Sequence, residues 1–278
     1  MAKINGTNGD DGFWGTERAD QIKLFGGNDW ADGWGGNDSI GGGAGDDYLS
    51  GGAGNDRIWG AEGNDSLFST ADADEVVGFG TDFDYLSGGP GNDYIGLFSG
   101  QGHAVGGSGN DFIIHYGGGA ARADGGTGDD RIINNNGTST GGAGNDRLEA
   151  WLADPEHDGD VLLWQTGRAF ADMTGGTGAD TFAITGDIRF MGSGAEVRDF
   201  HSAEGDKLAL GIIGFGNDFH GTGEVFGWLD QDRNGVLSGA DSAVGGAVWD
   251  DGSGITIGLA GSTVHVSGVH ALDWGLVV

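Results

Sequence analysis

A nine-residue repeat fills the first part of the chain and limits the folds open to it. Counted from Gly6, eight consecutive units run unbroken to Val77. Position six is Asp in every unit: Asp11, Asp20, Asp29, Asp38, Asp47, Asp56, Asp65 and Asp74. Position eight is apolar in every unit: Phe13, Ile22, Ala31, Ile40, Leu49, Ile58, Leu67 and Val76. Asp and Glu together are only 43 of 278 residues, so this register indicates a structural repeat.

Each unit divides into a glycine-rich half and a short alternating half. The first six residues predict a tight turn, and the last three predict a short strand whose middle side chain points inward. Two units would complete one coil, so that each residue stacks on the residue eighteen positions further along. A single unit cannot bury its apolar side chain, and the core forms only when coils stack. The sequence therefore predicts an all-β fold of stacked parallel coils.

The repeat continues beyond Val77 with defects. Further units begin at Gly88, Gly106, Gly125 and Gly141, and a last one begins at Gly175. Their sixth residues are Asp93, Asp111, Asp130, Asp146 and Asp180. Spacers of irregular length separate these units, and the unit that starts at Leu97 places Gly102 where Asp is expected. We expect this second stretch to hold fewer ions than the first.

The net charge of the chain indicates that its compact state needs a bound cation. Lys and Arg number 12 against 43 acidic residues, which gives a formal net charge of −31. Such self-repulsion destabilises a compact state unless something offsets it, and it makes nucleic acid a poor partner. Gly accounts for 64 residues and Pro for only 2, without a three-residue period, which excludes collagen. Calcium suits the pattern, because it takes six to eight oxygen ligands in irregular geometry.

These units resemble the RTX (hemolysin-type) calcium-binding nonapeptide GGxGxDxUx, in which U is a bulky apolar residue. The resemblance covers roughly residues 6–149 and returns at 175–183. It implies a right-handed parallel β-roll with calcium between successive turns on the same side. One turn would provide the carbonyls of positions two and four and the carboxylate of position six. The next turn would provide the carbonyls of positions one and three and its own carboxylate.

The resemblance carries this ligand scheme onto particular residues. It places one ion among Gly43, Gly45, Asp47, Gly60, Glu62 and Asp65, and another among Trp34, Gly36, Asp38, Gly51, Ala53 and Asp56. Other candidate ligands are Phe25, Gly27, Asp29, Gly42, Ala44, Gly52, Gly54, Asp74, Asp93, Asp111, Asp130, Asp146 and Asp180. We expect on the order of ten calcium ions, concentrated in residues 25–74.

The last third of the chain differs from the repeats. We expect the β-roll to span residues 1–149, an irregular insertion residues 150–174, and a C-terminal β cap residues 175–278. The segment after the last repeat resembles the closing segment of type I-secreted RTX exoproteins, at Asp199, Phe200, Asp206, Leu208 and Leu210. The alternating stretch ITIGLAGSTVHVSG predicts a hairpin. Residues 272–278 resemble the uncleaved C-terminal signal of type I secretion, and a final β-strand is the alternative.

A second metal signal lies between Asp230 and Asp241. The stretch DQDRNGVLSGAD matches an EF-hand calcium loop at Asp230, Asp232 and Asn234, with Val236 offering its carbonyl. Asp241 replaces the bidentate Glu that usually ends such a loop. Flanking helices are not evident, so we expect an isolated calcium loop rather than a paired EF-hand; a metal-free Asp/Asn turn is the alternative.

No catalytic motif stands out. The chain lacks H-E-x-x-H, and the match to G-x-S-x-G around Ser139 lies in a Gly/Asn-rich spacer rather than at a strand-to-helix elbow. Exposed aromatic residues at outward positions, among them Trp14, Trp30, Trp59 and Phe68, could contact sugars, or they could pack against spacer loops.

The sequence thus favours a non-enzymatic protein, secreted or at the cell surface, whose folding calcium triggers and whose role is structural, adhesive or in a matrix. Its expected partners are calcium, the type I secretion machinery and a polysaccharide or cell-surface ligand. The N-terminus lacks the apolar region of a cleaved signal peptide, and no membrane span is expected. A polysaccharide-modifying enzyme or a carbohydrate-binding module on a β-roll scaffold remains the alternative.

Overall fold

A computed structural model describes most of the chain, and every element whose bounds it gives is a strand. The described residues are 1–69, 82–98, 100–116, 119–134, 136–151, 170–187, 194–213, 219–220, 225, 236–238, 248–259, 262–273 and 276. The chain forms two compact units, Met1–Asn134 and Asn135–Val278. The expected domain boundary at residue 149 lies within the second unit and stays a prediction.

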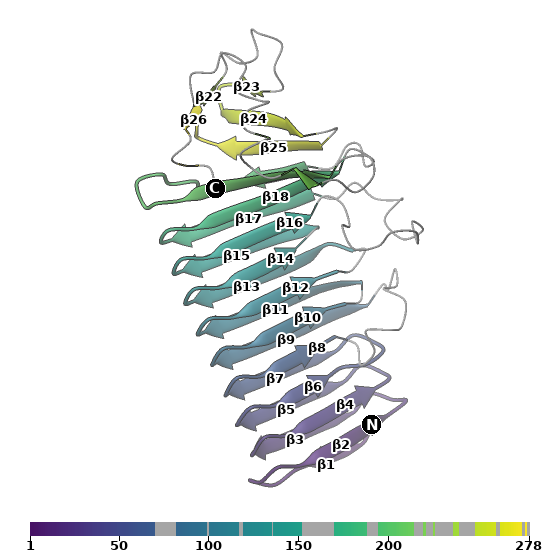
Figure 1. Ribbon diagram of the computed structural model, residues 1–278. Coiled ribbons are helices and arrows are strands. Elements are labelled where there is room, and N and C mark those ends of the chain that lie inside the picture. Colours follow the sequence, from purple (N-terminus) through teal and green to yellow (C-terminus); the bar gives the residue numbers. More distant parts are fainter. Residues whose placement is uncertain are drawn as a thin grey trace. The chain divides into compact units, whose positions relative to one another are not determined.

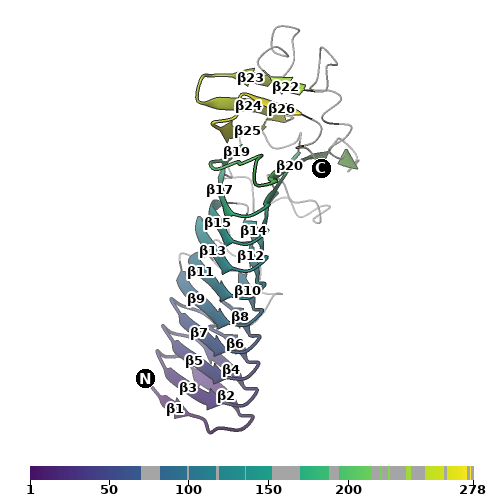
Figure 2. The ribbon, with the colours of Figure 1, turned by 90° about the vertical axis from the view of Figure 1, so that its left-hand side faces the viewer.

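The first unit consists of two parallel sheets whose strands alternate along the chain (Figures 1 and 2). The odd sheet contains β1 (Lys3–Asn5), β3 (Gln21–Gly26), β5 (Ser39–Ala44), β7 (Arg57–Glu62), β9 (Phe83–Pro90), β11 (Gln101–Ser108) and β13 (Ala121–Thr127). The even sheet contains β2 (Gly12–Thr16), β4 (Trp30–Trp34), β6 (Tyr48–Ser50), β8 (Ser66–Phe68), β10 (Tyr94–Leu97), β12 (Phe112–His115) and β14 (Arg131–Asn134). This is the predicted parallel β-roll, with one strand of each sheet per coil.

The register follows the nine-residue repeat through β8. Ile22 pairs with Ile40 and Ile40 with Ile58, each eighteen residues further on. The prediction that this register runs unbroken to Val77 is wrong. Ile58 in β7 pairs with Leu86 in β9, which is 28 residues further on, and Leu67 in β8 pairs with Ile95, also 28 residues further on. Ten additional residues therefore separate these neighbouring strands.

Position-eight side chains form the core of the first unit, as predicted. Side chains alternate across a strand, so the residues on either side of position eight point outward. The buried core includes Ile22, Ala31, Ile40, Leu49, Ile58, Leu67, Leu86, Ile95, Ile113 and Ile132, all at most 1% exposed. Each residue stacks on its equivalents in the coils before and after it, so burial requires neighbouring coils.

The second unit begins with the same arrangement and then changes. One sheet contains β15 (Gly137–Ala143), β17 (Phe170–Thr177), β19 (Gly194–Val197), β25 (Ser262–Ser267), β24 (Gly254–Leu259) and β23 (Val248–Asp250), in that order. The other contains β16 (Arg147–Trp151), β18 (Thr181–Asp187), β20 (Lys207–Ile213) and β21 (Phe219–His220). A separate pair contains β22 (Val236–Ser238) and β26 (Ala271–Asp273).

Parallel pairing gives way to antiparallel pairing in this unit. The β24–β25 pair is antiparallel, with Ile257 opposite Val264, which confirms the predicted hairpin. Phe200, Leu208 and Leu210, expected in the closing segment, lie in the buried core of this unit. Within the described part of the chain, no helix has the length and hydrophobicity needed to cross a bilayer.

Candidate calcium sites

Most of the repeat turns, from Phe25 onward, share one backbone conformation. Positions two and four have positive φ, for example 126° at Gly43 and 123° at Gly45. The same conformation occurs where position two is not Gly: φ is 78° at Phe25, 72° at Trp34 and 87° at Ala61. A non-glycine residue in this region costs of order 1–3 kcal/mol, so the surrounding turn must impose it.

The position-six Asp side chains form two ladders in the first unit. We call Asp20, Asp38, Asp56 and Asp84 the odd column, because the first three directly precede odd-sheet strands and Asp84 lies at the start of one. We call Asp11, Asp29, Asp47, Asp65, Asp93, Asp111 and Asp130 the even column. Along each column, an Asp N–H donates to Oδ1 of the Asp one coil further on; the N–H of Asp47, for example, lies 2.8 Å from Asp65 Oδ1. Oδ1 of each Asp that follows another in a column is thus held against the turn before it.

The second carboxylate oxygen of these residues is buried without a donor. Oδ2 has no hydrogen-bond partner in Asp29, Asp38, Asp47, Asp56, Asp65, Asp93, Asp111 and Asp180. A buried carboxylate oxygen without a partner is costly, and its repetition along the columns indicates that these oxygens bind a cation. Among the described residues, no three His, Asp or Glu side chains converge. A cation here would therefore be held mostly by main-chain carbonyls with one or two carboxylates, which suits calcium.

Position-one glycine leaves room beside this oxygen. A Cβ on Gly42 would collide with Asp47 Oδ2 and lie close to the Gly60 carbonyl of the next coil. Gly33 and Gly106 have the same neighbours, with Gly51 and Gly125 providing the carbonyls. The space beside Oδ2 is therefore bordered by a carboxylate and by the position-one carbonyl of the following turn.

Both predicted ligand sets lie in adjacent stacked turns. In the first set, Gly43 pairs with Ala61, next to Glu62, and the N–H of Asp47 donates to Asp65. In the second, Ala53 bridges to Gly35, between Trp34 and Gly36, and the N–H of Asp38 donates to Asp56 at 2.7 Å. The Glu62 and Ala53 carbonyls each accept an N–H from the coil before them, from Gly45 and Gly36. A carbonyl has a second lone pair, so these oxygens can still bind an ion.

The remaining predicted ligands occupy equivalent places. Phe25, Gly27 and Asp29 form the turn before the first set, Gly42 and Ala44 belong to the first set's own turn, and Gly52 and Gly54 belong to the turn of Asp56. Asp93, Asp111 and Asp130 continue the even column, and Asp146 and Asp180 form an equivalent ladder in the second unit. Ligation by these residues stays a prediction.

Burial changes the acidity of the columns. It raises the pKa of Asp56, Asp65 and Asp111 to about 7, and neighbouring Asp side chains add to the increase, against the lowering effect of the backbone hydrogen bond. The same causes raise the pKa of Asp38, Asp47, Asp130 and Asp180 to about 6. Removing water and adding like charges both disfavour the ionised form. Without a cation, the folded columns would hold protons near neutral pH.

The odd column ends early, and its last member was not predicted. Asp84 accepts the N–H of Asp56 at 2.8 Å, so it occupies the place that an unbroken register would give to Asp74. Asp74 itself lies outside the described residues. Beyond Asp84 the same position holds Gly102 and then Ala121. Reading the nine-residue frame backwards from Gly88 would have identified Asp84.

At the ends of the ladders, hydrogen-bond donors of the protein bind the Asp Oδ2 atoms. At the start of the first unit, the Thr16 N–H and hydroxyl donate to Asp20 Oδ2 at 2.8 and 2.7 Å, and Thr7 donates to Asp11 Oδ2 in the same way. In the second unit, the His201 N–H donates to Asp206 Oδ2 at 2.7 Å. Thr at position two, present as Thr7 and Thr16, is the sequence signal that distinguishes the first two turns.

Most of the predicted EF-hand-like loop is not described. Asp230, Asp232, Asn234 and Asp241 lie outside the described residues. Val236 begins β22, which pairs with β26. The loop as a calcium site stays a prediction.

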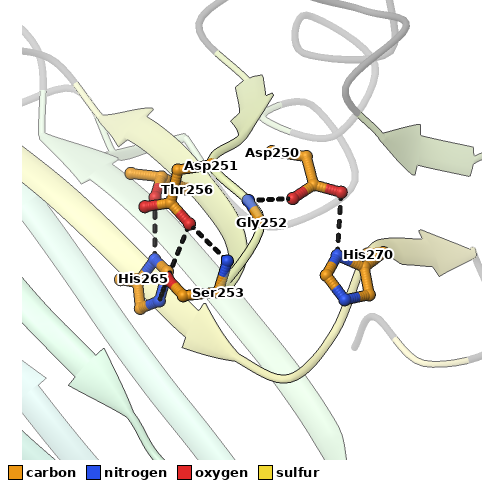
Figure 3. A network of polar contacts seen from close by, with 7 residues as sticks. All are labelled: Asp250, Asp251, Gly252, Ser253, Thr256, His265 and His270. Carbon is orange, nitrogen blue, oxygen red and sulfur yellow. Dashed lines mark hydrogen bonds and ion pairs between the residues drawn. The ribbon is translucent and has the colours of Figure 1, made fainter.

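A polar network in the second unit contains a Ser–His contact (Figure 3). His265 Nε2 lies 3.3 Å from Ser253 Oγ, and His265 Nδ1 lies 2.8 Å from Thr256 Oγ1. The single hydroxyl proton of Ser253 goes to Asp251 Oδ1 at 2.6 Å, so His265 donates from Nε2 and accepts at Nδ1. A histidine in that tautomer does not deprotonate Ser253, and the network instead holds the β23–β24 turn. Ser139, the other candidate nucleophile, is buried inside β15.

Comparison with known proteins identifies the repeats. The family model "RTX calcium-binding nonapeptide repeat (4 copies)" matches residues 5–40, 41–76 and 80–96. A search of curated proteins found no match to this chain. The matched segments lie in the first unit and include the columns from Asp11 to Asp93. The N-terminal region of the chain is therefore an array of RTX calcium-binding nonapeptide repeats.

Proposed function

We propose that this chain is a secreted protein whose β-roll folds when it meets extracellular calcium. Proteins with RTX repeats bind calcium and are typically secreted. The observation that carries the proposal is the row of buried Asp Oδ2 atoms without donors, repeated in register beside turns whose glycines leave space.

Ion binding would act on the folded state alone. Calcium bound in the columns supplies positive charge between carboxylates that otherwise repel one another. Each site needs oxygens from two stacked turns, and these are far apart in an unfolded chain. Any ligand that binds only the folded state stabilises it by RT ln(1 + [L]/Kd).

The number of stacked Asp pairs determines how much bound calcium can stabilise the folded state. Pairs in which a donor of the protein already binds an Asp Oδ2 are left out of this count. Two hydrogen-bonded Asp pairs then remain in the odd column, five in the even column and one in the second unit, which makes eight. At about 1 kcal/mol per site, the total is comparable with the whole stability of a domain, about 5–15 kcal/mol. Extracellular calcium modules bind at about 10⁻⁴–10⁻³ M. The chain would thus stay unfolded where calcium is scarce and fold where it is plentiful.

Secretion by a type I system fits this behaviour. An unfolded chain suits passage through a narrow channel, and residues 272–278 resemble the C-terminal signal of such systems. The EF-hand-like loop at Asp230–Asp241 would add one ion with locally supplied ligands.

A calcium titration tests the proposal. Circular dichroism should show an unfolded chain in chelator and β-structure at millimolar calcium, with a Hill slope above one because neighbouring sites share Asp residues. Magnesium should substitute poorly, since it requires tighter octahedral geometry. The same β spectrum and thermal midpoint in chelator and in calcium would contradict the proposal, as would two or fewer bound ions per chain by mass analysis.

A further inference from the structure

The outer face of the odd sheet in the first unit carries a charge opposite to that of the chain. Its outward positions flank the partly buried Ile4 and the buried residues Ile22, Ile40, Ile58, Leu86, Ala104 and Ala123. They include four basic residues, Lys3, Lys23, Arg57 and Arg122, and one acidic residue, Asp124. Acidic residues outnumber basic ones 43 to 12 in the whole chain, yet they are outnumbered 1 to 4 here. We call this surface the cationic face.

The register aligns these side chains along the direction in which the coils stack. One row runs through paired residues: Lys3, Gln21, Ser39, Arg57, Tyr85, His103 and Arg122. The row beside it contains Lys23, Gly41, Trp59 and Ser87. Strands lie about 4.8 Å apart, so six steps from Lys3 to Arg122 span roughly 29 Å. The face is therefore a long, narrow strip rather than a local patch.

The basic side chains on this strip have few partners in the protein. Among the described residues, Lys3, Lys23 and Arg57 form no ion pair, and Arg122 reaches Asp124 only at 3.9 Å. Unpaired cations in a chain with a net charge of −31 leave their charge available to a ligand. Aromatic rings lie between them: Trp59, 38% exposed, is 6.4 Å from Tyr85, which is 5.4 Å from His103.

The even sheet provides a contrast within the same unit. Its outer face is also rich in aromatic residues, including Trp14, Trp30, Tyr48, Tyr94 and Phe112, but carries one acidic residue, Asp32, and one basic residue, Arg131. Arg131 lies over the Phe112 ring at 5.1 Å. Charge therefore distinguishes the two faces, whereas aromatic content does not.

From these observations we infer that the cationic face binds an extended anionic polysaccharide, one that carries sulfate or carboxylate groups. A straight strip of cations matches a linear polyanion, because charge pairs can form along its whole length. The aromatic rings between the cations offer apolar surface on which the faces of sugar rings can pack. Calcium in the Asp columns would offset the acidic turns, so the folded, calcium-loaded roll is the binding form. The inference thus rests on the proposed function for the state in which the face exists.

Binding of the calcium-loaded full chain to dextran sulfate tests the inference, with uncharged dextran of the same length as the control. We expect calorimetry to detect binding to dextran sulfate alone, and the affinity to fall as salt is raised. In the variant Lys23→Gln/Arg57→Gln we expect roughly tenfold weaker binding. The control Arg18→Gln/Arg131→Gln removes the same charge away from this face and should bind like the unaltered chain. Trp59→Ala should weaken binding, whereas Trp14→Ala, on the even sheet, should not.

Several outcomes would overturn the inference. Equal loss in both double variants would mean that only net charge matters. Unchanged binding in Lys23→Gln/Arg57→Gln would mean that the polymer is held elsewhere, for example by bound calcium. Tighter binding to phosphatidylserine vesicles or to single-stranded DNA than to dextran sulfate would assign the face to a membrane or a nucleic acid. Circular dichroism recorded before the polymer is added shows whether the chain has folded in calcium. Failure to bind the polymer can then be distinguished from failure of calcium-dependent folding.

Discussion

At the scale of single residues, two neighbouring positions of one turn have opposite roles. Asp46 at position five is exposed, and its Oδ1 accepts the N–H of Asn64; Asn28 performs the same function for Asp46. Asp47 at position six is buried, and its Oδ2 has no donor. An amide can replace the first carboxylate, because only a hydrogen-bond acceptor is needed there. It cannot replace a carboxylate that shares an ion.

We therefore expect Asp47→Asn to weaken calcium binding and Asp46→Asn to leave it unchanged. The first change removes a charged ligand from a site shared by two turns, at a cost of about 1–3 kcal/mol, and should lower the thermal midpoint at saturating calcium. Calcium titration and differential scanning calorimetry of both variants provide the measurement. Equal behaviour of the two variants would show that the column carboxylates do not bind the ion.

The same buried carboxylates predict how pH acts on the calcium-free chain. Burial raises the pKa of Asp56, Asp65 and Asp111 to about 7 in the folded state, against about 3.9 in an unfolded chain. The folded state therefore binds more protons between these values. Its stability is greatest below about pH 4 and is lost as the pH rises towards 7.

In calcium-free buffer we accordingly expect β-structure to appear as the pH is lowered from 7.5 to 4. Calcium affinity should weaken over the interval from pH 7 to pH 5, because protons compete for the same oxygens. Circular dichroism across this range, with and without calcium, checks both statements. A calcium-free chain that loses structure on acidification would contradict the assigned direction of the pKa shifts.

At the scale of elements, the sequence predicted the strands better than it predicted the ends of the ladders. The sixth and eighth positions were enough to place Asp47, Ile58 and their equivalents, because each depends only on local repetition. Asp84 was missed, since it lies 28 rather than 18 residues after Asp56. The hydrogen bond from the Thr16 hydroxyl to Asp20 Oδ2 was not predicted either. The side chain that satisfies a buried carboxylate depends on which turn lies beside it, and periodicity does not report that.

A pair of adjacent glycines tests how the turn is built. Gly42 begins a turn, and a Cβ there would collide with Asp47 Oδ2. Gly41 lies on the outer face of β5, and a Cβ there would have nothing within 4 Å. We expect Gly42→Ala to remove about one ion and reduce stability, because the methyl group fills the space beside the carboxylate. Gly41→Ala should stay within about 0.5 kcal/mol of the unaltered chain.

Bound calcium per chain and the thermal midpoint distinguish the two glycine variants. If Gly42→Ala retained every ion, the space beside Asp47 Oδ2 would not be the calcium position.

At the scale of the whole molecule, we expect the inner coils of the first unit to be interchangeable modules. Removing residues 42–59 deletes one coil and joins Gly41 to Gly60, so that Asp29 meets Asp65 and Asp38 meets Asp84. We expect this variant to fold in calcium and to bind about two fewer ions, because stability in such arrays is a sum over neighbouring repeats. Removing residues 42–55 deletes a similar length but puts the strands out of register.

Circular dichroism in calcium, together with bound calcium per chain, compares the two deletions. Only the variant that lacks a whole coil should fold. Failure of both would show that the first unit depends on a fixed set of coils.

The Thr residues that close the first turns have a consequence for how such an array can lengthen over generations. A duplicated inner coil would bring its own Asp residues and its own space for an ion. A duplicated first coil would instead carry Thr7 and Thr16 into the interior of the array, where their donors occupy the oxygens that a cation needs. Duplication of an inner coil therefore adds calcium sites, whereas duplication of the first coil would place turns without such sites inside the array.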